Sequence, residues 1–396
     1  MLDLNTLKSL SSKMNTPLKH LLPFLLTPFV VHAADYTWTG AVDNNWDTAG
    51  NWSGDGGIPD DGSDLAIFDS SPGIVTLNNQ YLTRVSFQTA GWTIQGTGGF
   101  DLENLVSNAP LSSSGAGINT LAVTLFPDRN IDVDVSSGNT LVHTGTMSMD
   151  ASITKTGVGT LILNSSSTTA ESSNILVSGG TALINYDQVN SSSNGARPGA
   201  RDGGTIGGHG TIAVGGSSIT SNLQFRVAQS GSGTLSPGGD GTTEGGSIIG
   251  TLDIDFANAG SSNVITMYED SILAIDIDPV SNQSDLVNMF LSGGGSGAGW
   301  NIRSGATLDI TTVGGSAFDP GDSFIISTFI NSAGVADYGQ FDSVLINGND
   351  AFLNPEFYID YNLNSIEVGL IPEPGTYGLI SGLFILGLAT FRRRQK

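Results

Sequence analysis

The chain lacks cysteine and carries few charges, and both absences limit what it can be. None of its 396 residues is cysteine, and Asp, Glu, Lys and Arg together make up 13% of the sequence. Without disulfides, a chain of this length depends on a hydrophobic core, on stacked repeats or on bound ions for its stability. Its length allows one large or two medium domains.

Basic residues are scarce away from the two termini. Between residues 34 and 371, seven basic side chains face 35 acidic ones, a net charge of −28. The seven bases are Arg84, Arg129, Lys155, Arg197, Arg201, Arg226 and Arg303. Phosphate backbones bind mainly through Lys and Arg, so we expect no nucleic acid partner. Divalent cations suit such a surface better.

The N-terminal segment has the layout of a secretory signal peptide. In KHLLPFLLTPFVVHAADYTW a basic residue precedes an apolar run over residues 21–31, and small residues follow. Val31 and Ala33 fit the −3 and −1 positions of a cleavage site. Two prolines within the run disfavour a buried helix. Translation can begin at Met1 or Met14.

The C-terminal segment predicts a membrane span. Residues 375–391 carry no charge, and 17 residues lie within the roughly 17–25 that cross a bilayer as a helix. The bases that come next, Arg392, Arg393 and Arg394, would hold this end on the cytoplasmic side, with the acidic body outside.

A Pro-Glu-Pro triplet stands directly before this segment, at Pro372, Glu373 and Pro374. The order of triplet, hydrophobic helix and terminal arginines resembles the PEP-CTERM sorting signal of Gram-negative exopolysaccharide producers. That resemblance implies export, a membrane-anchored precursor, and processing near the triplet by an exosortase-type protease. The product would reach the cell surface or extracellular matrix. A plain single-span tail anchor is the alternative.

The body shows short β-branched and apolar runs separated by Gly, Ser, Asn and Asp, which is typical of turn-rich β structure. In SILAIDID, residues 271–278, aliphatic and acidic side chains alternate as in a half-buried strand. A Gly-Thr-aliphatic unit begins at Gly159, Gly204, Gly210, Gly233 and Gly250, with looser versions at Gly180 and Gly305. Several intervals are near 20 residues, which predicts a solenoid. We expect an all-β, right-handed parallel β-helix, with an antiparallel β-sandwich array as the alternative.

Residues 153–185 resemble the autotransporter-associated β-strand repeat. Its pattern is matched at Lys155, Gly157, Gly159, Thr160, Leu161, Gly179, Gly180 and Thr181. This resemblance implies a passenger-like β-helix, here without an autotransporter barrel.

Trp38, Trp46 and Trp52 open the mature chain. They predict either a cap on the end of the solenoid or a surface on which sugar rings stack. The expected organisation is a signal peptide (1–33), a Trp-rich β cap (34–110), a repeat body (111–313), a C-terminal β region (314–371) and a sorting tail (372–396).

Signals for chemistry are weak. Asp43, Asn45 and Asp47 alternate as in the first half of a calcium loop, but Thr48 and Gly54 replace the required Gly and Glu. Three carboxylate pairs allow weak Ca²⁺ binding, although solvated strand faces are the favoured explanation: Asp132/Asp134, Asp253/Asp255 and Asp276/Asp278.

Catalytic patterns are also weak. His143 and His209 belong to no triad motif, and His209 is expected to face water in a glycine turn. Lys155, Arg197, Arg201 and Arg226 are the candidate bases of a polysaccharide lyase. We expect no catalytic residues, metal site or cofactor.

Together these features predict a non-enzymatic structural or adhesive protein among exopolysaccharide or other surface glycans. A glycan-active enzyme and a carbohydrate-binding module are the alternatives.

Overall fold

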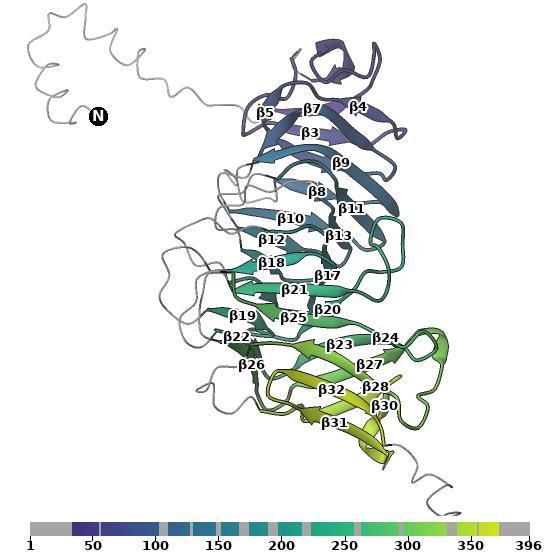
Figure 1. Cartoon of the computed structure of the whole chain (residues 1–396). Helices are drawn as coiled ribbons and strands as arrows, with labels where there is room; N and C mark the ends of the chain where they lie inside the picture. Colours follow the sequence, from purple (N-terminus) through teal and green to yellow (C-terminus); the bar gives the residue numbers. More distant parts are fainter. Residues whose placement is uncertain are drawn as a thin grey trace, which may run out of the picture.

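In a computed structural model the chain forms a long rod of stacked β-strands (Figure 1). The structure describes residues 34–54, 57–102, 110–126, 130–147, 152–165, 174–188, 197–215, 223–256, 263–292, 297–330, 339–354 and 356–371. Within these residues the regular structure is strand, with three short 3-10 turns: η2 (Ala49–Asn51), η3 (Val313–Gly315) and η4 (Ala351–Leu353).

The strands form three sheets, here called A, B and C. Sheet A contains β1 (Asp35–Trp38), β2 (Trp52–Ser53), β3 (Leu65–Phe68), β6 (Arg84–Phe87), β8 (Leu111–Ser113), β10 (Ile131–Val135), β12 (Ile153–Thr156), β14 (Ile175–Val177), β16 (Gly199–Ala200), β19 (Gln224–Val227), β22 (Asn263–Met267) and β26 (Ala298–Ile302). Sheet B contains β4 (Ile74–Thr76), β5 (Gln80–Leu82), β7 (Thr93–Asp101), β9 (Gly117–Phe126), β11 (Asn139–His143), β13 (Thr160–Leu163), β15 (Thr181–Ile184), β17 (Gly204–Gly208), β20 (Gly233–Pro237), β23 (Ser271–Asp278), β24 (Gln283–Ser284), β27 (Thr307–Thr312), β29 (Ser343–Ile346) and β30 (Asn349–Asp350). Sheet C contains β18 (Thr211–Val214), β21 (Thr251–Phe256), β25 (Leu286–Phe290), β28 (Ser323–Thr328), β31 (Phe357–Tyr361) and β32 (Ser365–Leu370).

Each turn of the chain places one strand in sheet A and the next in sheet B. Strands β10, β12 and β14 are parallel neighbours in sheet A, and β11, β13 and β15 in sheet B. From β18 onward the chain also adds strands to sheet C. This is the arrangement of a β-solenoid, and its parallel ladders are not those of the alternative β-sandwich array.

The Gly-Thr units mark the register of sheet B. Their threonines stack in neighbouring strands: Thr160, Thr181, Thr205 and Thr234. Thr140, which follows Asn139, continues the same column. The next residue of each strand points inward and is buried: Leu141, Leu161, Ala182, Ile206 and Leu235. The repeat predicted at these positions is therefore confirmed. The units at Gly210 and Gly250 instead lead into sheet C, where Thr211 pairs with Asp253.

Glycine is required where sheet A turns into sheet B. A Cβ at Gly159 would lie 2.2 Å from the Ser136 carbonyl oxygen. Gly180, with φ of 60°, would bring a Cβ within 2.3 Å of the Gly159 oxygen. Because the corners of successive turns lie directly on one another, a side chain has no room there.

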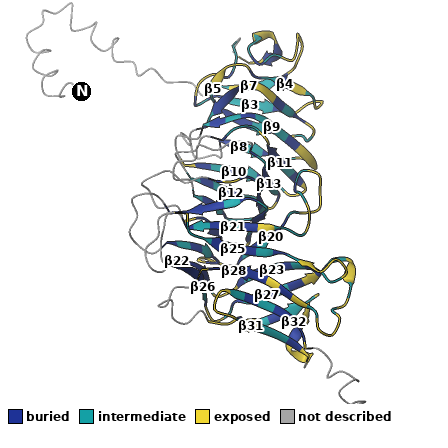
Figure 2. Cartoon of the chain, viewed as in Figure 1, coloured by how far each residue is buried: buried dark blue, intermediate teal, exposed yellow. Residues whose placement is uncertain are grey.

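The predicted strand in residues 271–278 is β23, and its alternation is confirmed. Leu273, Ile275 and Ile277 are buried, whereas Asp276 and Asp278 are only partly covered. Buried residues lie along the strands, and exposed residues occupy the loops, including those at both ends of the rod (Figure 2).

A smaller apolar cluster lies on the outer face of sheet B. It contains Val142, Ile162 and Leu183. Loop 238–250 lies against this part of sheet B. The side-chain amides of Asn164 and Asn185 donate to backbone oxygens of the loop and hold it there. This aliphatic cluster is buried although it lies on the outer face of the sheet.

The ends of the stack differ from its middle. At the N-terminal end β2 pairs antiparallel with β1, and the parallel stack already begins with β1 and β3. At the C-terminal end β31 and β32 form an antiparallel hairpin beside β28. No change of sheet marks the boundary expected at residue 110, since sheet A runs without a break from β6 through β8 to β10.

Within the described residues no helix is long and apolar enough to cross a membrane. The predicted signal peptide (1–33) and the predicted span (375–391) lie outside the described residues.

Candidate functional site

The three tryptophans proposed to cap the rod or to stack on sugars are buried. Trp46 is fully covered, and Trp38 and Trp52 are nearly so. The Trp46 and Trp52 ring centroids lie 4.6 Å apart, those of Trp38 and Trp52 4.9 Å apart. Trp52 Nε1 donates a 2.8 Å hydrogen bond to the Trp46 carbonyl. Sugar stacking needs an exposed ring face, so this arrangement favours the cap.

The polar groups of the DNNWD segment complete this cap. The Asn51 side-chain amide donates to Asp43 Oδ1 at 2.6 Å and to the Asn45 carbonyl at 2.8 Å. Hydrogen bonding from the Asn45 backbone N–H and the Asn51 side chain lowers the pKa of Asp43. Asp47 accepts from the hydroxyl of Tyr81. These oxygens are already engaged within the protein.

The carboxylate pairs occupy outer strand faces. Asp253 accepts from the Asn288 amide at 2.7 Å, and Asp255 accepts from the Ser292 hydroxyl at 2.6 Å. Burial, and secondarily the neighbouring Asp309, raises the pKa of Asp276. Among the residues that the structure describes, no three His, Asp or Glu side chains are grouped so as to hold a metal ion.

The two histidines differ from a catalytic arrangement. His143 is buried with Nε2 3.0 Å from the Val123 carbonyl oxygen, and burial lowers its pKa to about 4. We expected His209 to face water, but it is half-buried and one of its ring nitrogens is fully covered. A Cβ on Gly250 would lie 2.0 Å from His209 Nδ1, and His209 Nε2 is buried without a hydrogen-bond partner.

Lys155 points into the rod rather than out of it. Its Nζ donates to the carbonyls of Thr156, Gly157 and Gly179 at 2.7, 2.8 and 3.1 Å. Burial lowers its pKa to about 8, opposed by the charge of Asp134. Because the ammonium binds the backbone of two successive corners, it serves as a bridge between turns.

Of the other candidate bases, Arg201 and Arg226 lie near one corner of the rod, together with Arg303. Strand register places Ala200, Val227, Met267 and Ile302 in one buried column. The residues after them, Arg201, Ala228, Tyr268 and Arg303, continue the same backbone ladder into the corner. Arg226 lies on the adjoining strand face, where its guanidinium donates to Gln224 and Gln229.

A groove of about 460 Å³ lies at this corner. The Arg303 guanidinium carbon is 4.2 Å from the centroid of the Tyr268 ring, and Glu269 and Asp270 complete the wall. Ala228 and Asp270 have φ near 60°, a conformation that non-glycine residues rarely adopt. Such backbone strain is enriched at ligand-binding sites. We call this site the corner groove.

The groove is suited to binding rather than to proton abstraction. A guanidinium stays protonated in proteins, so Arg303 and Arg201 cannot act as a general base at neutral pH. Arg201 is also paired with Asp202 at 3.4 Å. Arginine, carboxylate and tyrosine groups together can donate to and accept from sugar hydroxyls.

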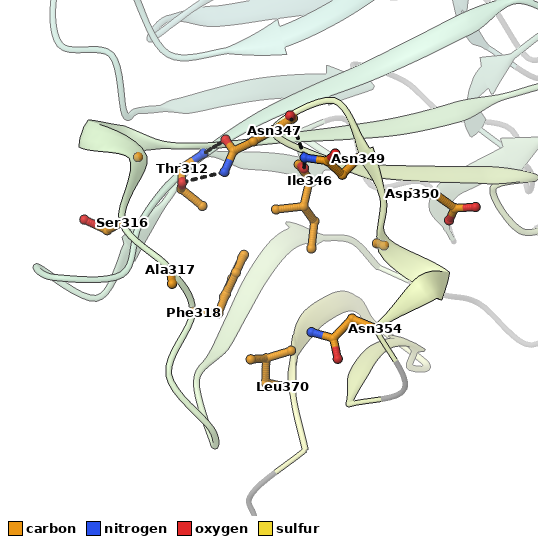
Figure 3. Close-up of a pocket in the computed structure, with 12 residues that line it drawn as sticks. Thr312, Ser316, Ala317, Phe318, Ile346, Asn347, Asn349, Asp350, Asn354 and Leu370 are labelled. Atoms are coloured by element: carbon orange, nitrogen blue, oxygen red, sulfur yellow. Dashed lines mark hydrogen bonds between the residues drawn. The ribbon is translucent and has the colours of Figure 1, made fainter.

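A second hollow of about 370 Å³ lies near the C-terminal end (Figure 3). Phe318, Ile346 and Leu370 form its apolar side, and Asn354 lies at its edge. Asn347 Oδ1 accepts from the Thr312 backbone N–H, and Asn347 Nδ2 donates to the Thr312 hydroxyl, both at 2.9 Å. Part of its polar lining is therefore occupied by bonds within the protein.

The six sorting-motif residues fall outside the described residues: Pro372, Glu373, Pro374, Arg392, Arg393 and Arg394. No family model matches this chain, and no curated protein sequence matches it. The PEP-CTERM and repeat resemblances therefore depend on their local motifs alone.

Sequence reasoning missed the corner groove. Tyr268 and Arg303 are 35 residues apart, and only the pairing of β22 with β26 brings them together. Because acidic residues greatly outnumber basic ones, the few arginines could have been singled out from the sequence. Their position at one corner of the rod could not.

Proposed function

We propose that this chain is an exported, non-enzymatic structural or adhesive protein of a Gram-negative cell surface or matrix. It is a right-handed β-helix whose C-terminal signal first anchors it in the membrane through residues 375–391. An exosortase-type protease then processes the chain near residues 372–374. Exopolysaccharide or other surface glycans are its surroundings, and no cofactor is required.

The observation that carries this proposal is the uninterrupted, mostly parallel stack, with 12 strands along sheet A and 14 along sheet B. Such a stack is stable without disulfides because each turn buries the apolar face of the next. Its acidic residues keep neighbouring rods apart in solution and disfavour nucleic acid.

The sorting step is tested by replacing Glu373 with Ala in the native host. Two prolines disfavour helix and keep the triplet extended, which suits recognition by a protease. We expect the variant to retain its tail, as measured by mass spectrometry of the mature C-terminus. A Thr376→Ala variant, just beyond the triplet, is the matched control. Identical processing of all three proteins would refute sorting through the triplet.

A glycan-binding role for the corner groove is the second candidate, and the stacking of Arg303 on Tyr268 favours it. Arg303→Gln should weaken binding to a neutral polysaccharide probe such as dextran. Arg197→Gln, an exposed arginine outside the groove lining, is the control. Equal binding by both variants, measured by calorimetry, would remove this candidate.

A further inference from the structure

Exposed large apolar side chains are concentrated at the C-terminal end of the rod. Six of the twelve in the described chain fall within residues 325–371: Ile325, Ile330, Phe352, Leu353, Leu363 and Ile371. The other six are scattered over residues 42–280. Scattered exposed residues are ordinary, but a local concentration marks an interaction surface.

Four of these side chains, here called the apolar end, lie in the last elements of the rod before the chain leaves it. Phe352 and Leu353, 55% and 81% exposed, lie in η4, directly after the outermost strand of sheet B. Leu363, 71% exposed, occupies the turn of the hairpin that ends sheet C. Ile371, 50% exposed, comes directly after the second strand of that hairpin.

The backbone that carries two of these side chains is hydrogen-bonded. The Asp350 carboxylate accepts from the Phe352 N–H at 2.9 Å and fixes η4. The Ile371 N–H donates to the Glu356 carbonyl at 2.7 Å and ties the departing chain beside it. The exposed residues at this end therefore belong to hydrogen-bonded structure, and Figure 2 shows exposed loops there beside more buried strands.

Chain length limits how far this surface can be from a membrane. Three residues separate Ile371 from the predicted span that begins at residue 375. At about 3.3–3.6 Å per residue, the four steps reach roughly 14 Å at most. The headgroup region on each side of the hydrocarbon core is about 5–8 Å thick. A rod tethered so briefly has its end at the headgroups.

We propose that the apolar end rests in the headgroup region of a neutral phospholipid surface while the tail still anchors the chain. This inference rests on the proposed membrane-anchored precursor. Between residues 304 and 371 there are nine carboxylates and no base, so anionic lipid would repel this end. The short tether gives the surface a high effective concentration at the bilayer, which makes weak contacts sufficient. Removal of the tail would abolish that advantage and release the rod.

The absence of cysteine allows a direct test, since each introduced cysteine is unique. Full-length Leu353→Cys and Leu363→Cys carry a polarity-sensitive fluorophore and are reconstituted in phosphatidylcholine vesicles. Val158→Cys, 70% exposed in the middle of the rod, is the matched control. We expect a blue shift and quenching by lipid-attached nitroxide at 353 and 363, and neither at 158. Adding phosphatidylglycerol should reduce both signals.

Flotation of the vesicles distinguishes the two possible failures. If the protein floats with the vesicles but all three labels report water, the docking inference is overturned and the anchor stands. If the protein does not float, the anchored precursor and the docking inference both fail. Two labelled positions guard against a local disturbance at either site.

Discussion

At the N-terminal end of the rod three tryptophans pack behind an irregular segment, whereas the C-terminal end leaves Leu353 and Leu363 in water. Both ends must close a stack whose last turn lacks a neighbour. The first does so by burying large rings and satisfying polar groups with Asn51. The second does so with antiparallel strands and keeps apolar side chains outside.

This difference agrees with the sequence context of the two ends. The N-terminal cap would face water once the predicted leader was removed, and a large exposed apolar surface there would promote aggregation. The C-terminal end continues within four residues into the predicted membrane span. If that span forms, exposed apolar groups at this end would have a neighbouring surface to contact.

Trp46→Ala, at the N-terminal end, should have the largest effect on stability of the changes considered. Removing a fully buried tryptophan from between Trp52 and Phe100 is expected to cost about 3–5 kcal/mol of unfolding free energy. Chemical denaturation followed by circular dichroism measures it. Trp46→Phe, which keeps a ring, should lose clearly less. An unchanged midpoint for Trp46→Ala would mean that the N-terminal end does not stabilise the rod.

Acidification tests whether the middle of the rod, rather than either end, fails first. His143 has a pKa near 4 in the fold against 6.5 in the unfolded chain, because burial disfavours its charged form. The unfolded state thus binds more protons between these values, and stability falls as the pH drops from 6.5 to 4. The loss at pH 4 should be about 3 kcal/mol.

His143→Gln should flatten this pH dependence, as measured by thermal unfolding at a series of pH values. Its stability above pH 7 is the control for loss of packing. If the variant and the parent lose stability equally between pH 6.5 and 4, acid unfolding begins elsewhere, and the ends become the first candidates.

The smallest change in unfolding free energy is expected at the C-terminal end of the rod, opposite Trp46. Leu353→Ser removes a side chain that is 81% exposed, so the free energy of unfolding should change by no more than about 0.5 kcal/mol. Denaturation under the conditions used for Trp46→Ala provides the comparison. A loss of about 2 kcal/mol or more, on the scale of a core truncation, would show that Leu353 belongs to the fold rather than to a free surface.

The predictions that succeeded rest on local periodicity. Alternation in residues 271–278 indicated which side chains of β23 are buried, and the Gly-Thr unit indicated the register of sheet B. Both patterns arise because every parallel strand repeats the same contacts with the strand before it. A single sequence therefore records them.

The features that the sequence did not reveal, such as the corner groove, depend on connections of unequal length. Val227 and Met267 are neighbours although 40 residues separate them, and Met267 and Ile302 although 35 do. No fixed repeat predicts those pairings, so the common corner of Arg201 and Arg303 was hidden. The same irregularity brings loop 238–250 beside sheet B and partly covers His209.

The sequence by itself determined that this chain forms glycine-cornered strands with an aliphatic interior, because alternation and turn residues act over a few neighbouring positions. It also determined the short distance between the last strand and the predicted span. Only the tertiary structure decided that Lys155 points inward, that the tryptophans are covered and that apolar residues gather at one end. Those outcomes depend on which turns lie side by side, and long-range backbone pairing sets that.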